Sequence, residues 1–288
     1  MRDLTPQAIR PLIHQALKED AASYDLTSHA VIPRDARIEA RIIAGGKGVA
    51  AGLKVAALTF TTLDRGLRCR LHVRSGAAVR PGMPMLTVSG RAQTIFAAER
   101  TALNFLGHLS GIATLTAEYV RRVRGTKAAI VDTRKTVPGL RALEKYAVRA
   151  GSGRNHRLNL ADQLLIKTNH LKVLYPGFRT KLDAIEHAIA MGKSRYPHRL
   201  LGIEVADLEE FEAALTTGSE LILLDNWPVA AMAEAVRRRR RYPGTLLEAS
   251  GGVTLANVRA IARTGVDRIS IGRLTHSAPA LDVSLEVI

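Results

Sequence analysis

Basic side chains gather in one stretch of the chain, residues 131–170, where they outnumber the acids Asp132, Glu144 and Asp162. They stand beside glycines and a proline, between short apolar runs, which is typical of a pocket for a small polyanion rather than of a solvated helix face. Arginine binds carboxylates and phosphates through a two-pronged fork, and lysine acts as a point charge. The basic residues are Arg134, Lys135, Arg141, Lys145, Arg149, Arg154, Arg157 and Lys167.

Two carboxylates, Glu204 and Asp225, each stand near the end of a short apolar run. Paired carboxylates in a basic pocket suit general acid–base chemistry or the binding of Mg²⁺ through oxygen atoms. The alternative is that they only neutralise neighbouring arginines and lysines. We favour magnesium and charge placement, because a phosphate site beside carboxylates usually needs a bridging metal ion.

The sequence Ser250-Gly251-Gly252 precedes a predicted helix. Glycines there let backbone N–H groups approach a phosphate, and the start of a helix adds favourable charge. A tight strand–helix turn explains the same residues equally well. Gly272, after a later apolar run, is a candidate for the other half of a phosphate site.

The histidines and the tryptophan are ambiguous. His156 and His170 suit hydrogen bonding to a substrate, but a structural role is at least as plausible for each. We expect His108, in an apolar helix, to contribute to packing, and Trp227 to form part of the wall of the barrel.

The elements that must position these groups are six apolar runs separated by helical stretches, which implies parallel strands with helical crossovers. In an α/β barrel the carboxyl ends of the strands share one face, where active sites are built. The candidate residues follow these ends. The predicted strands are 129–131, 164–166, 200–205, 221–224, 246–249 and 268–271, and the predicted helices start near Pro138, Thr180, Asp207, Pro228 and Thr254.

The first third of the chain resembles a small α+β domain. We predict a helix over 4–18, capped by Thr5 with its start complicated by Pro11, and a polar loop that ends at Pro33. Later elements are strands over 37–44, 69–74 and 85–89, a helix over 49–63, and a long helix over 94–122 that Gly107 and Gly111 are expected to bend or divide.

Composition limits the class of protein. Hydrophobic residues make up 47% of the 288 residues, and Cys69 is the one cysteine, which excludes an internal disulfide and suits a reducing cytosol. The first ten residues lack an apolar signal core, so we expect a soluble cytoplasmic protein. The formal charge of +16 favours anionic partners. For Arg237–Arg241 we prefer the solvated end of a helix to a binding patch, and nucleic-acid binding is weakly supported because no aromatics alternate with the basic residues.

Several long motifs make the chain resemble the quinolinate phosphoribosyltransferase family, in order and over almost the whole length. An N-terminal ED…DLTS pattern over 19–28 also fits. The motifs are AERTALNFLGHLSGIAT (98–114), DTRKTVPGLRALEKYAV (132–148), NHRLNL (155–160), LIKTNH (165–170), LLDN (223–226), LEASGG (247–252) and GVDRISIGRLTHS (265–277).

The resemblance implies an α/β fold, with an N-terminal α/β sandwich domain and a C-terminal open, incomplete α/β barrel of about six parallel strands. The implied boundaries are 1–112 for the sandwich, 113–275 for the barrel and 276–288 for a segment that packs back on the N-terminal domain. It implies homodimers or larger homo-oligomers with shared sites. The implied enzyme is a pentosyltransferase that converts quinolinate and phosphoribosyl pyrophosphate, with Mg²⁺, to nicotinate mononucleotide, pyrophosphate and CO2 in NAD biosynthesis.

Residue by residue, the resemblance implies catalytic roles for Lys135, Glu204 and Asp225, the two carboxylates lying near the ribose and the magnesium ion, directly or indirectly. Arg100 would reach the partner subunit's site. The implied substrate-binding residues are Arg100, Thr133, Arg134, Lys135, His156, Arg157, Lys167, Glu204, Asp225, Ser250, Gly251, Gly252, Ser270 and Gly272.

The chain departs from the family pattern at four positions. Thr168 stands where an acid is usual, Gly202 where a second glutamate is common, Ser152 within a usual run of glycines, and Arg273 where a small residue is usual. Loss of negative charge at Thr168 and Gly202 leaves open a related transferase that acts on another pyridine or azole acid.

Overall fold

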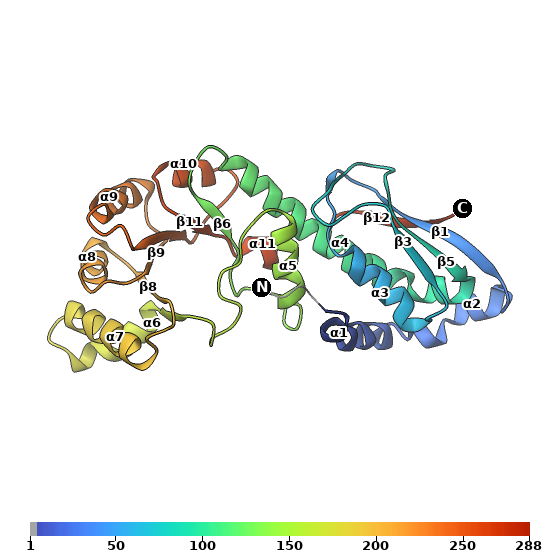
Figure 1. Ribbon diagram of the computed structural model, residues 1–288, viewed down its shortest axis with the longest axis horizontal. Helices are drawn as coiled ribbons and strands as arrows, with labels where there is room; N and C mark the ends of the chain where they lie inside the picture. Colours follow the sequence, from blue (N-terminus) through green and yellow to red (C-terminus); the bar gives the residue numbers. More distant parts are fainter. Residues whose placement is uncertain (1–4) are drawn as a thin grey trace. The chain divides into compact units, whose positions relative to one another are not determined.

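The computed structural model describes residues 5–288, and the chain divides into two compact units (Figure 1). The first contains residues up to Ala117, with Thr136–Ser152 and Arg273–Ile288; the second contains Glu118–Lys135 and Gly153–Gly272. The units are not consecutive segments of the chain, whereas the expected domains 1–112, 113–275 and 276–288 are. Those boundaries stay a prediction.

The first unit is built on an antiparallel sheet in the order β12-β1-β5-β3. Its last strand in sequence pairs with its first, with Ile42 opposite Leu285, so the C-terminal segment completes this sheet. The strands are β1 (Arg37–Ala44), β3 (Arg68–Leu71), β5 (Pro84–Arg91) and β12 (Val283–Val287), and a separate pair is formed by β2 (Gly48–Val49) and β4 (Ala78–Val79).

The helices of the first unit correct three predictions. The helix predicted over 49–63 begins at Leu53, because Val49 belongs to a strand in which it pairs with Ala78. The Thr5 side chain accepts the Ala8 N–H and caps a helix that runs through Pro11, so Pro11 does not start it; residue 4 lies outside the described residues. The polar stretch before Pro33 is not a loop, because Asp25 caps a short helix by accepting the Ser28 N–H. The helices are α1 (Pro6–Glu19), η1 (Ala22–Tyr24), α2 (Leu26–Val31), α3 (Leu53–Leu63), α5 (Arg141–Ala150) and α11 (Arg273–His276).

The long helix α4 (Ala92–Arg122) is continuous, so the prediction that Gly107 and Gly111 divide it is wrong. Both glycines instead allow the backbone of the C-terminal segment to approach the helix closely. The Leu281 N–H donates to the Gly107 carbonyl oxygen (2.9 Å), and a Cβ atom on Gly111 would clash with the carbonyl oxygen of Pro279. The missing side chains allow close backbone approach rather than a break.

The second unit is an α/β layer with six parallel strands in the order β6-β11-β10-β9-β8-β7, which confirms the predicted fold class. All six strands match predicted runs. They are β6 (Ala129–Val131), β7 (Leu164–Ile166), β8 (Leu201–Val205), β9 (Leu221–Asp225), β10 (Leu246–Ser250) and β11 (Arg268–Ser270), and the helices are α6 (Thr168–Leu174), η2 (Tyr175–Gly177), α7 (Lys181–Arg195), α8 (Leu208–Thr216), α9 (Val229–Arg239) and α10 (Val258–Arg263).

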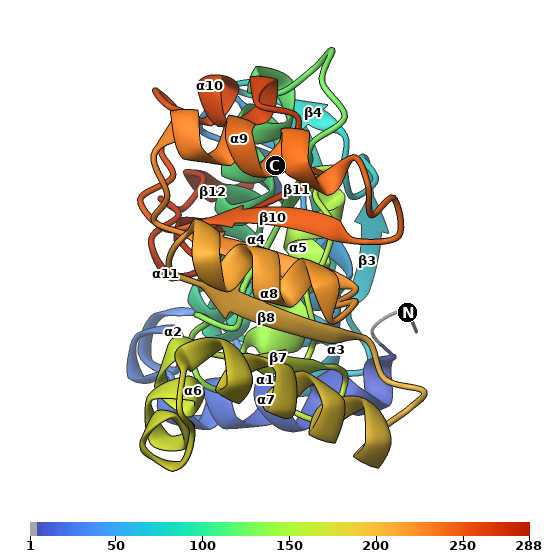
Figure 2. The ribbon, with the colours of Figure 1, turned by 90° about the vertical axis from the view of Figure 1, so that its left-hand side faces the viewer.

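Alternation along the strands separates two faces of this sheet. Helices α7 to α10 lie along one face (Figures 1 and 2), and apolar residues such as Ile203, Ile222 and Leu247 are fully buried. The residues that alternate with these along each strand point to the other face, and several of them are charged. On that face Glu204 lies opposite Leu223, Leu223 opposite Glu248, and Glu248 opposite Arg268 on the neighbouring strands. This charged face, called the inner face below, is where the candidate residues lie.

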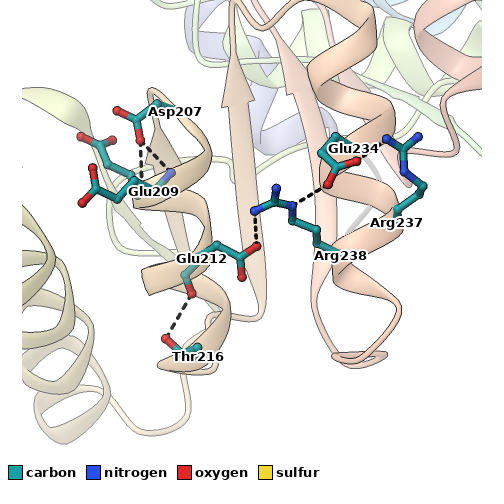
Figure 3. Close-up of polar contacts among 8 residues, drawn as sticks. Asp207, Glu209, Glu212, Thr216, Glu234, Arg237 and Arg238 are labelled. Carbon is teal, nitrogen blue, oxygen red and sulfur yellow. Dashed lines mark hydrogen bonds and ion pairs between the residues drawn. The ribbon is translucent and has the colours of Figure 1, made fainter.

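The arginine run forms the end of α9 and the turn after it, as expected. Arg238 bonds Glu212 on α8 (2.8 Å) and Glu234 on its own helix (2.7 Å), and Arg237 also pairs with Glu234 (Figure 3). Arg239 pairs with Asp267 (3.2 Å). The ion pairs of Arg238 with Glu212 and of Arg239 with Asp267 connect α9 to neighbouring parts of the second unit.

Across residues 5–288, every helix is too short or too polar to cross a membrane.

Candidate active site at the carboxyl edge of the parallel sheet

The second unit brings most of the predicted site residues to one edge of its sheet. Because all six strands run in the same direction, their carboxyl ends meet there. Thr133, Arg134 and Lys135 follow β6, and Lys167 follows β7. The remaining members at or near strand ends are Glu204 on β8, Asp225 on β9, Ser250, Gly251 and Gly252 at the end of β10, and Ser270 and Gly272 at the end of β11.

Asp132 organises the loop that carries His156 and Arg157. Its side chain is fully buried; one oxygen accepts the His156 N–H (2.8 Å) and the other accepts the Asn155 side-chain amide (2.5 Å). Val131 also forms a parallel bridge with Arg154. The loop therefore lies beside β6 and brings two distant motifs together.

Two guanidinium groups lie close together in this loop region. Arg157 is 7% exposed and donates to the Gln163 carbonyl oxygen (3.1 Å). Burial, and then the positive charge of Arg134, lower the pKa of Arg157. The Arg134 Nε atom is buried and has no hydrogen-bond partner among residues 5–288. Two repelling cations, one of which has an unused Nε–H donor, are suited to binding an anion with two carboxylates.

A second cluster joins the ends of β7 and β8. The Thr168 hydroxyl donates to Glu204 Oε1 (2.6 Å), and Lys167 Nζ lies 3.6 Å from Glu204 Oε2. Thr168 thus supplies a neutral donor where the family resemblance leads one to expect an acid. His170 accepts the Lys167 backbone N–H (2.9 Å), which gives this histidine a structural role at the start of α6.

The glycine turn after β10 packs against the end of β9. Asn226 donates to Asp225 Oδ2 (2.9 Å) and its backbone N–H donates to the Ser250 carbonyl oxygen (2.8 Å). A Cβ atom on Gly251 would clash with the Asn226 side chain, and Gly251 and Gly252 have φ angles of 84° and 58°. The turn therefore requires glycine for its own packing.

The predicted helix start near Thr254 lies one turn before the regular helix. Helix α10 begins at Val258, and Thr254 and Asn257 hold the turn before it by exchanging side-chain and backbone hydrogen bonds (2.8 and 3.3 Å). The glycine turn is thus separated from the helix, and backbone N–H groups of the turn, rather than a helix N-terminus, are the donors available there.

Glu204 and Asp225 were also the predicted metal neighbours. No group of three or more His, Cys, Asp or Glu side chains that could hold a metal ion occurs within residues 5–288. Glu204 is engaged by Thr168 and Lys167, and one Asp225 oxygen accepts from Asn226. Two carboxylates fit Mg²⁺ that is held mainly by a diphosphate, which is how this ion commonly binds. The metal roles stay a prediction.

Arg100 belongs to the first unit, where it is exposed on α4. It lines a pocket of about 380 Å³ together with Glu19, Asp20 and His108. His108 does more than pack, because its Nε2 lies 2.9 Å from the fully buried Glu144. Trp227 is buried on the second unit, where its indole N–H donates to the Val205 carbonyl oxygen (3.0 Å).

Sequence reasoning missed Glu248. It lies between the apolar residues Leu247 and Ala249 in the middle of β10, and its side chain is fully buried. A glutamate inside an apolar strand was the available signal, because a buried acid is rare unless it has a partner. It lies within the LEASGG motif, of which only the serine and glycines were assigned.

Comparison with known proteins identifies the family. Residues 25–110 match the family model for the quinolinate phosphoribosyl transferase N-terminal domain, and residues 112–286 match the model for its C-terminal domain. The chain belongs to the quinolinate phosphoribosyl transferase family. The resemblance predicted from the motifs is thereby confirmed.

Relatives of this transferase family match over nearly the full chain. The nicotinate-nucleotide pyrophosphorylase [carboxylating] of Mycobacterium leprae is 43% identical over 291 residues and covers 100% of both chains. A probable nicotinate-nucleotide pyrophosphorylase [carboxylating] of Bacillus subtilis is 36% identical, covering 97% of this chain and 93% of the relative.

A solved structure agrees in fold. The nicotinate-nucleotide pyrophosphorylase from Francisella tularensis superposes with a TM-score of 0.91 at 32% identity, covering 99% of this chain and 98% of that one. Such a match over both units supports the predicted combination of an α/β sandwich and an open α/β barrel.

Proposed function

We propose that the chain transfers phosphoribosyl from phosphoribosyl pyrophosphate to quinolinate with loss of CO2, giving nicotinate mononucleotide and pyrophosphate. The chain is a pentosyltransferase of NAD biosynthesis, as its family and its carboxylating relatives indicate. The structural observation that supports the substrate assignment is the neighbouring guanidinium groups of Arg157, which is buried, and Arg134, whose Nε atom is buried without a hydrogen-bond partner among residues 5–288. A dicarboxylate relieves their repulsion and can accept from the unused Arg134 Nε–H.

The charge distribution fits the reaction. As pyrophosphate leaves, positive charge develops on the ribose, and the carboxylates of Glu204 and Asp225 at the strand ends are suited to stabilise it. Lys135, beside Arg134, is exposed and suited to contact an anionic group of either substrate. Mg²⁺ bound with the diphosphate would supply positive charge to the leaving group.

Decarboxylation needs no covalent group from the protein. Transfer forms a bond between the ring nitrogen and the ribose, which makes the ring cationic. When the carbon–carbon bond to one carboxylate breaks, CO2 departs and its electron pair stays on the ring carbon, where the cationic ring stabilises it and a proton from solvent replaces the lost group. Binding and orientation therefore suffice.

Thr133, Ser250, Gly251, Gly252, Ser270 and Gly272 complete the proposed phosphate and substrate contacts. The side chain of Thr133 accepts the Lys135 backbone N–H (3.0 Å), and Ser270 is buried at the end of β11. We further propose a homo-oligomer with shared sites, in which Arg100 serves the partner subunit's site, and a cytoplasmic location, which suits a chain with one free cysteine.

The test is turnover of purified protein with quinolinate, phosphoribosyl pyrophosphate and Mg²⁺. We expect release of CO2 and formation of nicotinate mononucleotide in equal amounts, measured by trapping labelled CO2 and by chromatography. Folded protein that produces neither compound would refute the proposal. Omitting Mg²⁺ and adding a chelator should abolish turnover if the metal takes part.

A second candidate is a related transferase with another pyridine or azole acid as acceptor. Thr168 supports it, because it puts a hydroxyl on Glu204 where an acid is usual. So does Gly202, whose Cβ position faces Leu165 and Leu221 at 3.2 and 3.4 Å, an apolar environment on the inner face. A panel of pyridine and azole acids decides between them, and quinolinate as the best acceptor rules this candidate out.

A further inference from the structure

Glu248 is a charged residue for which the proposed reaction has assigned no role. Its side chain is fully buried on the inner face, directly opposite Arg268 on β11. Neither carboxylate oxygen has a hydrogen-bond partner within residues 5–288. An acid that is buried without hydrogen bonds is costly, so its retention in the middle of a strand calls for a specific partner.

The partner is the imidazole of His156. Its Nε2 lies 3.5 Å from Glu248 Oε1, and the His156 side chain is 6% exposed. The other ring nitrogen, Nδ1, accepts the Arg157 backbone N–H (2.8 Å) and must carry a lone pair to do so. The ring hydrogen of neutral His156 therefore sits on Nε2, the atom that faces Glu248.

The groups around Glu248 set its protonation. Burial is the largest influence and raises the pKa of Glu248 to about 7. The nearby Ser270 hydroxyl, whose own hydrogen bond goes to the Ala249 carbonyl oxygen (3.4 Å), and the charge of Arg268 lower the pKa, while Asp132 raises it. The carboxyl group thus changes charge near neutral pH.

We propose that Glu248 is a positioning residue for the acceptor pocket, holding the His156 imidazole from the inner face so that the loop with Arg157 presents its donors to the dicarboxylate. The proposal rests on the proposed function for its substrate. When ionised, Glu248 attracts the Nε2–H electrostatically across the 3.5 Å contact and orients the ring. When protonated, it is neutral and that charge-assisted contact is lost.

The same loop links the ring to the acceptor pocket. His156 precedes Arg157, its ring accepts the Arg157 N–H, and Asp132 accepts the His156 N–H. Rotation of the ring therefore breaks the bond that fixes the Arg157 backbone. Glu248 acts on substrate through these two residues and touches no reacting atom.

The experiment compares the wild type with Glu248→Gln between pH 6 and pH 8.5. Glutamine keeps the shape and holds the neutral state at every pH. At pH 8 we expect a five- to tenfold higher quinolinate KM in the variant, with kcat changed less than twofold, since Glu248 acts on the substrate only through His156 and Arg157 and its loss has a smaller effect than the loss of a direct charge-assisted hydrogen bond. At pH 6 the two proteins should converge, because wild-type Glu248 is then protonated.

A spectroscopic measurement keeps the proposal testable without turnover. Nitrogen-15 NMR at pH 8 should show His156 with its hydrogen on Nε2, and the Nε2 shift should differ between the wild type and Glu248→Gln. The matched control is Glu144→Gln, since Glu144 is another fully buried glutamate beside a histidine but lies in the first unit. The control should give the wild-type His156 shifts.

Three results would overturn the proposal: a hydrogen on Nδ1, a His156 Nε2 shift at pH 8 that Glu248→Gln leaves unchanged, or a variant KM at pH 8 equal to or below that of the wild type. A lower KM would mean that Glu248 only repels the dianion. Absence of any quinolinate turnover in wild type, with the NMR difference between wild type and Glu248→Gln intact, would refute the proposed function while leaving the Glu248–His156 contact established.

Discussion

The charged residues on the inner face of the parallel sheet lie at two levels along the strands, one at the carboxyl edge and one further inside the sheet. Glu248 and Arg268 oppose each other within the strands, and Asp225 and Ser250 oppose each other one pleat further toward the carboxyl edge. Groups at the edge are half-buried and accessible to a ligand, whereas Glu248 is fully buried. Edge residues are therefore suited to contact substrate, and the deeper glutamate acts through its neighbours.

Replacing Arg134 by alanine should raise the quinolinate KM by about 10- to 100-fold, because a charge-assisted hydrogen bond to a carboxylate contributes roughly 1.5–3 kcal/mol. Steady-state kinetics at saturating phosphoribosyl pyrophosphate measures the change. Arg124→Ala is the control, since Arg124 is exposed in the turn after α4 and should leave the kinetics unchanged. Near-normal KM for Arg134→Ala would exclude it from the acceptor pocket.

Glu248 also makes stability depend on pH. Its folded pKa of about 7 lies above the usual 4.5, so between these values the folded protein holds a proton that the unfolded chain has lost. Stability should therefore fall as pH rises from 4.5 to 7, by at most about 3 kcal/mol from this group. Urea unfolding at pH 5 and pH 8 should show a larger fall for the wild type than for Glu248→Gln; equal falls would contradict the raised pKa.

At the scale of elements, the parallel strands were predictable because each is a short apolar run with flanking helix caps. Asp207 illustrates the caps, accepting the N–H groups of Glu209 and Glu210 at the start of α8 (3.0 and 2.9 Å; Figure 3). Strand order and register come from contacts distant in sequence, so the pairing of β12 with β1 could not be predicted.

Prediction failed where polar residues form their own local bonds. Helix α6 follows Lys167 directly and was missed, because its first residues, Thr168 to His170, are polar and carry the signature of a loop. The set of candidate residues at strand ends was readable from the sequence because carboxyl ends of parallel strands must meet. The contact between Glu248 and His156 was not, since it joins two motifs far apart in the chain.

Helix α4 offers a test at the element scale. Gly111→Ala should destabilise the protein by about 1–3 kcal/mol, the usual cost of inserting an atom into a packed contact, because its Cβ atom would clash with the Pro279 backbone. If Gly111 were merely a flexible point in the helix, alanine would stabilise it by up to about 1 kcal/mol. The sign of the change in urea unfolding decides. Gly244→Ala, with nothing within 4 Å of the added atom, is the control.

For the whole molecule, the formal charge of +16 indicates attraction to anions but not a nucleic-acid surface. In the most basic run, three arginines form ion pairs with carboxylates. Arg237 and Arg238 pair with Glu234, Arg238 also pairs with Glu212, and Arg239 pairs with Asp267. The charges at the sheet edge, by contrast, include Arg134, whose Nε–H has no hydrogen-bond partner among residues 5–288. Small anions with several charges fit this distribution better than a duplex does.

The proposed sharing of sites between subunits is tested by mixing two variants, each of which should be nearly inactive at a low quinolinate concentration. Arg100 lies in the first unit and Arg134 in the second. If Arg100 serves the partner subunit's site, a hybrid dimer of Arg100→Ala and Arg134→Ala chains contains one site with both arginines intact. Random exchange of subunits makes about half the dimers hybrid, so about a quarter of the wild-type activity should return. If Arg100 acts within its own chain, or the subunits never associate, mixing restores nothing. Size-exclusion chromatography of the mixture separates those two failures, because only the first leaves a dimer.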